Sequence, residues 1–257
     1  MEEQQKSLCR WEPLSGGARV LVSWEHGFGT DAVLLADFSR PKPGESWVDL
    51  GTGCGVIPLL WRVRTKVGKI TGVEIREQAA EQAKRSVEEN GFAGEITILH
   101  GDARELSASF AAGSLDGIAC NPPYTATGAG IPSPSDARRT ARQGDSFTLE
   151  DLAQTAKYAL RFGGRLCVCL RPNRLGEAVE VFHRADLEPK RLRLVQQRRE
   201  KAPFLFLMEC RRGGKPGMTV EPVLLLEGED GSPTEEIETI YGDYRDNPEH
   251  KGSRPAK

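Results

Sequence analysis

The sequence has no apolar run of about 18 residues, the length that a membrane-spanning helix requires. Its first ten residues, MEEQQKSLCR, also lack the apolar segment of a signal peptide. These two absences exclude an integral membrane protein from the expected classes and predict a cytoplasmic protein without membrane contact.

Metal-binding and disulfide patterns are missing as well. The chain has six cysteines, but it contains no Cys-x-x-Cys pair and no cysteine at ligand spacing from a histidine. We therefore expect no metal site, and we expect the cysteines to serve as small apolar residues in a reducing compartment. They are Cys9, Cys54, Cys120, Cys167, Cys169 and Cys210.

An excess of one charge is absent too, because the net charge is −2. This value excludes a uniformly basic nucleic-acid-binding protein. The distribution is uneven, however: basic residues dominate between Lys190 and Lys215, and acidic ones dominate from Glu227 onward. The pattern predicts a positive end of the fold and a negative C-terminal region.

Short apolar runs alternate with helical patterns, which predicts an α/β fold with a mostly parallel sheet. Helices are expected over 30–38, 56–66, 77–89 (stopping at Asn90-Gly91), from a cap at Thr148 to just before Phe162, and over 175–184. We expect one large domain at 27–245, after an N-terminal extension at 1–26 and before a disordered tail at 246–257. The seven candidate strands are 47–50, 70–75, 96–99, 116–120, 165–170, 192–195 and 204–209.

The segment VDLGTGCGV has the strongest local pattern, a strand that ends in Asp49 followed by Gly51, Gly53, Gly55 and a helix. Glycines let the backbone turn sharply and approach a ligand, and the helix that follows offers amide donors and a positive dipole end. A dinucleotide fingerprint would require glycine at position 56, where the chain has Val56. The loop therefore predicts a nucleotide-like cofactor and makes NAD a poor candidate.

Asn121, Pro122, Pro123 and Tyr124 follow the apolar run LDGIAC. Proline fixes its own φ, restricts the residue before it and carries no N–H. The segment therefore offers Asn121 Oδ1 and the Pro122 carbonyl as a rigid pair of acceptors, suited to a planar amino group with two hydrogens to donate. Tyr124 adds an aromatic face for stacking.

Taken together, these motifs resemble motif I of the S-adenosylmethionine-dependent methyltransferases and motif IV of the amino-methyltransferases. The resemblance implies a Rossmann-like class I methyltransferase fold, with a seven-stranded, mostly parallel sheet and helices on both faces. It implies S-adenosylmethionine as the cofactor, its methionine portion in the glycine loop, its ribose on Glu74, and its adenine amino group on Asp102, with Ala103 beside it. Asn121, Pro122 and Tyr124 would then be catalytic, and Asn121 would also meet the cofactor.

The stretch HGFGTDAVLLADF narrows the resemblance to bacterial tRNA adenine-N6 methyltransferases, which modify the adenosine beside the anticodon of a valine tRNA. The similarity runs from about Gly27 to Tyr241 and includes ARRTARQ and PTEEIETIYG. It implies that Gly29, Thr30 and Asp31 line the methionine end of the cofactor.

RNA is the expected partner. The expected substrate-binding residues are Pro123, Tyr124, Arg138, Arg139 and Arg142, where arginines would meet phosphates. A second candidate RNA surface is formed by Arg191, Arg193, Arg198 and Arg199.

Three alternatives remain open. Glutamine methyltransferases of release factors also carry this four-residue motif, but they usually have a helical N-terminal domain, and only about 25 residues precede GFGTDAV here. A noncatalytic RNA-binding module need not retain the glycine loop or the acidic strand ends. A DNA adenine methyltransferase would be expected to carry a separate target-recognition domain.

Overall fold

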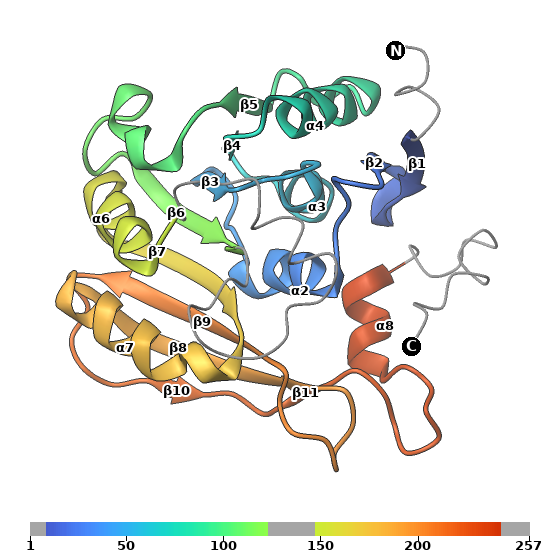
Figure 1. The fold of residues 1–257 in the computed structure, drawn as a ribbon, viewed down its shortest axis with the longest axis vertical. Coiled ribbons are helices and arrows are strands. Elements are labelled where there is room, and N and C mark those ends of the chain that lie inside the picture. The colour runs from blue at the N-terminus through green and yellow to red at the C-terminus, as the bar shows by residue number, and fades with distance from the viewer. Residues whose placement is uncertain (1–8, 123–146, 243–257) are drawn as a thin grey trace.

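The structure is a computed structural model that describes residues 9–122 and 147–242. One sheet dominates it, and α-helices connect most of its parallel strands (Figure 1). The helices of the described segments are α2 (Thr30–Ser39), α3 (Val56–Arg64), α4 (Glu77–Glu89), α6 (Leu149–Ala159), α7 (Leu175–Arg184) and α8 (Glu235–Tyr241). The strands are β1 (Cys9–Pro13), β2 (Arg19–Ser23), β3 (Ser46–Leu50), β4 (Lys69–Glu74), β5 (Ile96–His100), β6 (Leu115–Cys120), β7 (Leu160–Leu170), β8 (Leu187–Gln196), β9 (Leu205–Arg212), β10 (Thr219–Val220) and β11 (Leu224–Leu225).

The large sheet has the order β10-β8-β9-β7-β6-β3-β4-β5, and β11 also pairs with β8. The β3, β4, β5, β6 and β7 strands are mutually parallel, and β9 runs antiparallel to both β7 and β8. After β3 the chain moves outward to β4 and β5, then returns to the other side of β3 with β6. Such a reversal leaves a crevice at the carboxyl ends of the strands, where α/β folds bind their ligands.

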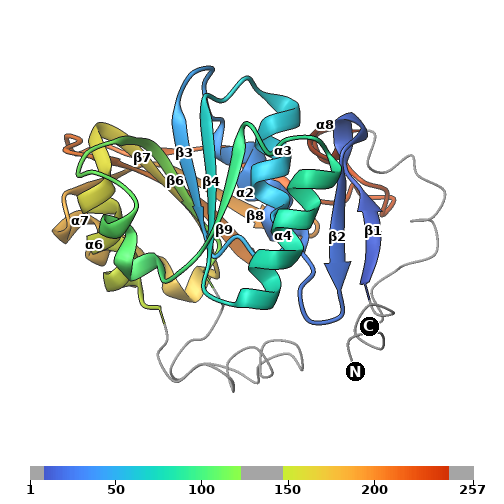
Figure 2. The same ribbon diagram turned by 90° about the horizontal axis from the view of Figure 1, so that it is seen from above.

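Helices cover both faces of the sheet, as Figure 2 shows from above. One core lies under α2, α3, α4 and α8, and the other lies under α6 and α7. Because both faces of the central strands are buried, β3, β6 and β7 contain consecutive buried residues without a regular polar alternation. Cys167 and Cys169 lie in the first core, on one face of β7 as their spacing predicts. All six cysteines are free, and five of them are buried.

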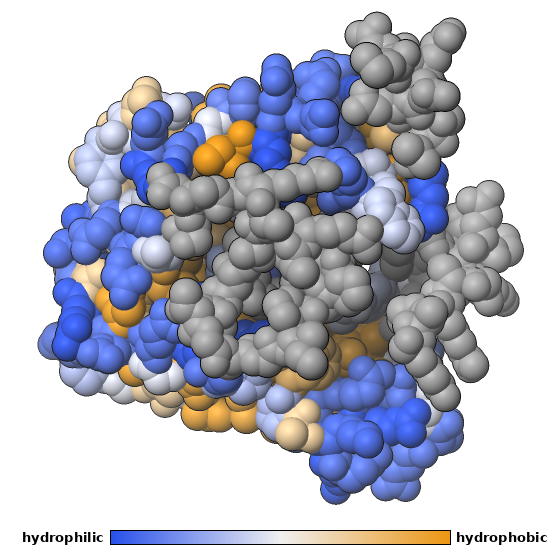
Figure 3. Space-filling model, viewed as in Figure 1, coloured by the Kyte–Doolittle hydropathy of each residue, from blue (hydrophilic) through white to orange (hydrophobic). Residues whose placement is uncertain are grey.

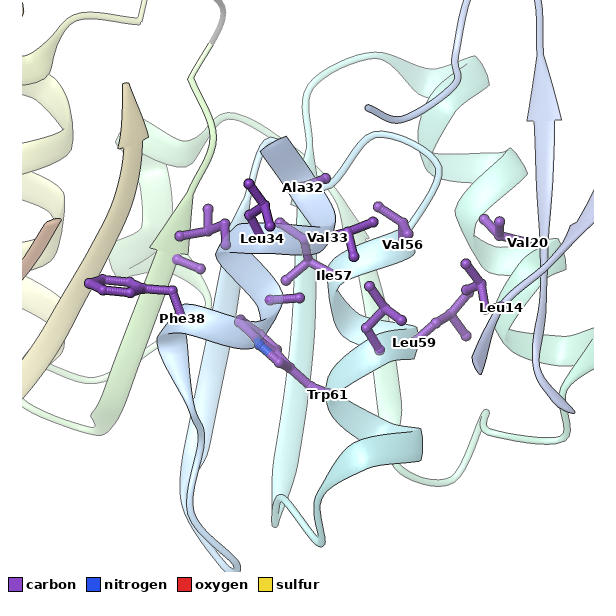
Figure 4. Close-up of a cluster of buried hydrophobic side chains, with 14 of the residues drawn as sticks. Leu14, Val20, Ala32, Val33, Leu34, Phe38, Val56, Ile57, Leu59 and Trp61 are labelled. Atoms are coloured by element: carbon purple, nitrogen blue, oxygen red, sulfur yellow. The ribbon is translucent and has the colours of Figure 1, made fainter. Parts of the chain in front are cut away.

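The α2 and α3 helices pack side by side through apolar side chains (Figure 4). Val33 and Leu34 of α2 and Ile57 and Leu59 of α3 are each at most 3% exposed. The α3 helix also buries Trp61, whose Nε1 donates to Ser39 Oγ at the end of α2 over 2.8 Å. This packing fixes the start of α2 beside the glycine loop, which leads into α3.

The β1–β2 hairpin was not predicted from the sequence. It lies within the proposed N-terminal extension and is held against α4 by polar side chains of that helix. Ser86 Oγ accepts from the Leu21 amide over 2.9 Å, and Gln82 Nε2 donates to the Leu21 and His26 carbonyls over 2.7 and 2.6 Å. The missed signal was the turn LSGG between two five-residue runs of strand character.

Some basic and acidic residues of the C-terminal half pair with each other, so the predicted positive end and negative region are not fully separate. Arg193 forms a bidentate ion pair with Glu236 at 2.7 Å, and Arg198 pairs with Glu227 at 2.6 Å. Arg191 is partly buried between Glu209 and Glu221, 3.4 and 3.5 Å away. These arginines are therefore engaged within the fold and are poorly placed to form the second RNA surface.

The predicted fold class is confirmed. All seven predicted strands are present, as β3 to β9, and the two-residue strands β10 and β11 extend the sheet beside β8. Helices α4 and α7 have the predicted bounds, and Thr148 and Asp151 form the predicted capping box of α6. The division into extension, domain and tail stays a prediction, and residues 1–8 and 243–257 lie outside the described segments.

Replacing Gln82 by methionine tests how the hairpin is held. Methionine fills a similar volume but cannot donate to the two carbonyls, and each buried acceptor left unpaired costs about 1 to 3 kcal/mol. We expect urea denaturation to show a lower free energy of unfolding for Gln82→Met. The matched control is Gln78→Met, at an exposed position on the same helix, which should change stability little. Equal stabilities of the two variants would contradict this role of Gln82.

Candidate functional site

The register of the sheet brings three strand ends to one level. Leu50 of β3 pairs with Val73 of β4 on one side and with Cys120 of β6 on the other. The residues that follow them in the chain are Gly51, Glu74 and Asn121. These three residues therefore emerge together at the carboxyl edge of the sheet.

A pocket opens at this edge and combines polar strand ends with apolar walls. Among the described residues, its lining includes six of the predicted site residues. These are Gly51, Glu74, Asp102, Ala103, Asn121 and Pro122. The other predicted residues within the described segments lie outside the wall of the pocket: Gly29, Thr30, Asp31, Asp49, Gly53 and Gly55.

The glycine loop needs its glycines for conformation. Gly51, Gly53 and Gly55 have φ values of 75°, 57° and 86°, in the left-handed region that other residues rarely adopt. A Cβ on Gly51 or Gly53 would meet nothing within 4 Å, whereas a Cβ on Gly55 would lie 3.2 Å from the Ala83 side chain. The first two glycines therefore shape an open backbone surface, and the third lets α3 approach α4.

Glu74 ties the glycine loop to β4. Its carboxylate is almost fully buried and accepts from the Gly53 amide over 2.8 Å. Its second oxygen accepts from the backbone amide and the Nε of Arg76, over 3.0 and 2.9 Å. A carboxylate has about four lone-pair positions, so Glu74 keeps acceptor capacity toward the pocket that it lines.

Asp102 also lines the pocket and is paired with Arg104. The Arg104 Nε lies 2.9 Å from one carboxylate oxygen and the Arg104 amide 2.9 Å from the other. These interactions lower the pKa of Asp102 below its ordinary value, against the opposing effect of partial burial. Asp102 is thus an acceptor with a negative charge at the pocket wall.

Asp49 lies beneath the glycine loop and is only 1% exposed. Burial, with a smaller effect of the nearby Glu74, raises the pKa of Asp49 to about 7 against the opposing effect of the Thr52 hydroxyl. Asp49 Oδ2 and Thr52 Oγ1 are buried and find no hydrogen-bond partner within the described residues. A buried carboxylate that lacks a partner favours a nearby cation or a proton.

Asn121 is fixed at the end of β6 by the first turn of α2. Its Nδ2 donates to Asp31 Oδ2 over 2.8 Å. The Pro122 backbone follows at the pocket wall, and Pro122 has no N–H to donate. The predicted residues Pro123, Tyr124, Arg138, Arg139 and Arg142 lie outside the described residues.

Among the pocket residues that sequence reasoning missed are Ile75, Arg76 and Phe147. Ile75 is 49% exposed, unusual for a large apolar residue directly after a buried strand. Together with Phe147 it gives the pocket apolar side chains that suit a planar ring. The position of Ile75 directly after Glu74, the last residue of the strand, was the available signal. An apolar residue there lies beyond the buried part of the strand.

The arrangement combines an apolar slot with acceptors spaced along it. Such a pocket can hold a nucleoside by its ring, ribose hydroxyls and amino groups. The part of the chain that the structure describes holds no cluster of three or more His, Cys, Asp or Glu side chains placed to share a metal ion. None of the described helices is long and apolar enough to cross a bilayer.

Comparison with known proteins defines the class. The family model of the methyltransferase small domain matches residues 25–184. The fold is that of a class I methyltransferase, with TM-score 0.68 to a predicted O-methyltransferase from Agrobacterium tumefaciens, at 21% identity over 84% of this chain and 97% of that one. The chain belongs to the methyltransferase small domain family and is a methyltransferase.

Curated relatives carry a more specific name. A protein of Serratia proteamaculans is 30% identical over 84% of this chain and 82% of its own length. One of Photorhabdus laumondii is 29% identical over 84% of this chain and 87% of its own length. A third, from Porphyromonas gingivalis, is 31% identical over 71% of this chain and 73% of its own length. Each is named tRNA1(Val) (adenine(37)-N6)-methyltransferase.

The raised pKa of Asp49 predicts a pH dependence of stability. A group whose pKa is higher in the folded than in the unfolded state binds more protons when folded, so it stabilises the fold at low pH. The contribution of Asp49 to the free energy of unfolding is therefore lost as pH rises from about 4 to about 7. Asp49→Asn removes this titration. We expect its free energy of unfolding to rise relative to the native chain over this range, by at most about 4 kcal/mol at 1.4 kcal/mol per pKa unit, and to level off above pH 7.

Asp116→Asn is the matched control. Partial burial raises the pKa of Asp116, but the Ser46 amide and Arg161 lower it, and its pKa lies below the ordinary value. The stability contribution of a lowered pKa is constant above the unfolded value and is lost only below about pH 4. Urea denaturation of this variant at pH 5 and pH 8 should show the same difference from the native chain. An equally constant difference for Asp49→Asn would show that Asp49 does not titrate as described.

Proposed function

We propose that this methyltransferase transfers a methyl group from S-adenosylmethionine to the exocyclic N6 amine of an adenine in RNA, namely a tRNA adenosine next to the anticodon. The observation that carries the proposal is the register of the sheet, which sets Asn121 and Pro122 in the wall of the same pocket as Glu74 and Asp102. A donor site and an acceptor-lined amine site would thus share one cavity.

The residues of the pocket fit this cofactor. Glu74 has acceptor capacity for the ribose hydroxyls, Asp102 for the adenine amino group, and Ile75 and Phe147 offer apolar faces for the ring. The unpartnered Asp49 Oδ2 beneath the open backbone of Gly51 and Gly53 suits a site whose ligand brings a positive charge nearby. The bound cofactor would supply an electrophilic methyl group on a sulfonium sulfur.

On the acceptor side, Asn121 Oδ1 and the Pro122 carbonyl would receive the two hydrogens of the target amine. Accepting both hydrogens orients the nitrogen lone pair and stabilises the positive charge that develops on nitrogen as the new N–C bond forms. The same oxygens favour the amine over a hydroxyl, which has only one hydrogen to donate.

The substrate class is supported by the names of the curated relatives. In Figure 3 hydrophilic residues dominate the outer part of the face, and hydrophobic residues also border the grey atoms. A tRNA substrate also agrees with the cytoplasmic location expected from the sequence. Methyl transfer should weaken with added salt, since phosphate contacts release counterions.

The direct test is a methyl-transfer assay with labelled cofactor. We expect label on an unmodified valine tRNA transcript and none on the same transcript with guanosine in place of the adenosine beside the anticodon. Digestion to nucleosides should give N6-methyladenosine. Label on a release factor instead of the tRNA would overturn the RNA assignment.

Asn121→Ala tests the amine site in the same assay. Loss of one oriented acceptor should lower kcat by about 100-fold or more, in the range found for residues that stabilise developing charge. Calorimetric affinity for S-adenosylhomocysteine should remain within about twofold, because the proposed contact is with the amine. A large loss of that affinity would give Asn121 a different role.

A further inference from the structure

Asp31 contacts Asn121 across 90 residues of sequence, from the first turn of α2 to the end of β6, with 2.8 Å between Asp31 Oδ2 and Asn121 Nδ2. We propose that Asp31 is a positioning residue, which fixes the amide orientation of Asn121 so that Oδ1 faces the substrate amine. The inference rests on the proposed function, and it assigns Asp31 a task other than contact with the cofactor.

The argument follows from donors and acceptors. An asparagine amide has one acceptor end and one donor end of similar shape, and rotation about its last torsion exchanges them. A carboxylate offers only acceptors, so it binds the Nδ2 end of the amide and leaves Oδ1 on the other side. A reversed amide would present hydrogens to an amine that itself donates hydrogens, and the site would lose its acceptor.

Gly29 shows that the position of Asp31 is built into the local structure. Its φ of −120° is open to any residue, so the backbone does not require glycine there. A Cβ at this position would instead lie 2.6 Å from Asp31 Oδ1. The missing side chain therefore makes room for the Asp31 carboxylate in the orientation that reaches Asn121.

The C-terminal helix α8 holds the start of α2 from the other side. The Tyr241 hydroxyl donates to Thr30 Oγ1 over 2.9 Å, and Tyr241 is 8% exposed. The helix is itself fixed by the Arg193–Glu236 ion pair and by Arg64, which donates to the Ile240 carbonyl. A segment at the end of the described chain thus supports the residue that orients Asn121.

The two possible tasks of Asp31 differ in the quantity that they affect. A positioning residue supports turnover without touching the cofactor, whereas a partner of a cationic cofactor group supports cofactor affinity. Asp31→Ala removes both acceptor oxygens, and Asp31→Asn keeps one acceptor but adds a donor end that a reversed Asn121 amide can also satisfy.

The experiment measures kcat on the tRNA transcript and the calorimetric affinity for S-adenosylhomocysteine. We expect Asp31→Ala to lower kcat by about 10- to 100-fold, the scale of a misplaced catalytic group, and Asp31→Asn to lower it less, because one of its two amide orientations still accepts from Asn121 Nδ2. Both should bind S-adenosylhomocysteine within about twofold of the native affinity. Full kcat in Asp31→Ala, or equal damage with weakened affinity in both variants, would overturn the proposal.

A second readout does not depend on methyl transfer. The Asn121 side-chain amide gives one ¹⁵N-correlated pair of NMR signals, identified as the pair missing from Asn121→Ala. In the native chain, this pair should show the shift and slow solvent exchange of a hydrogen-bonded amide, and Asp31→Ala should lose both. An unchanged pair in Asp31→Ala would overturn the proposal, whereas native chain that methylates no tRNA adenine would overturn only the proposed function.

Discussion

The parallel register of β3 with β4 and β6 is the constraint on which the site depends. Because Leu50 is level with both Val73 and Cys120, the residues after these strands meet at one edge. The reversal of the chain on either side of β3 keeps that edge free of a crossover helix at this point. Gly51, Glu74 and Asn121 therefore line one pocket.

Four carboxylates surround this edge, and each lies in a different environment. Asp49 is buried and its Oδ2 lacks a hydrogen-bond partner within the described residues, Glu74 is buried and tied to the Gly53 amide, Asp102 is paired with Arg104, and Asp31 binds Asn121. Environment rather than residue type therefore divides their tasks, because burial, hydrogen bonding and ion pairing act differently on the charged form of a carboxylate. A sequence that shows only an acidic residue after a strand cannot make this distinction.

Local sequence signals predicted much of the fold. Apolar runs located β3 to β9, the Asn90-Gly91 exit ended α4, and the Thr148 cap began α6. The conformation of Gly51 and Gly53 also agrees with the predicted ligand loop.

Contacts between distant segments could not be predicted in the same way. The β1–β2 hairpin depends on side chains of α4. Arg193 of β8 and Arg198 after it pair with Glu236 and Glu227, which lie 43 and 29 positions further along the chain. The contact between Asp31 and Asn121 depends on where α2 packs against the sheet, a property of the assembled core. Periodicity and turn residues report local structure only, and pairing across the fold leaves no trace in them.

The central claim is that a methyl-donor site and an amine site share the pocket at this edge. A crystal structure of the complex with S-adenosylhomocysteine tests it most directly. The account predicts ribose hydroxyls on Glu74, the adenine ring between Ile75 and Phe147, and the sulfur on the side of the pocket that Asn121 lines. A nucleoside bound elsewhere, or Asn121 Oδ1 turned away from the cavity, would contradict the account.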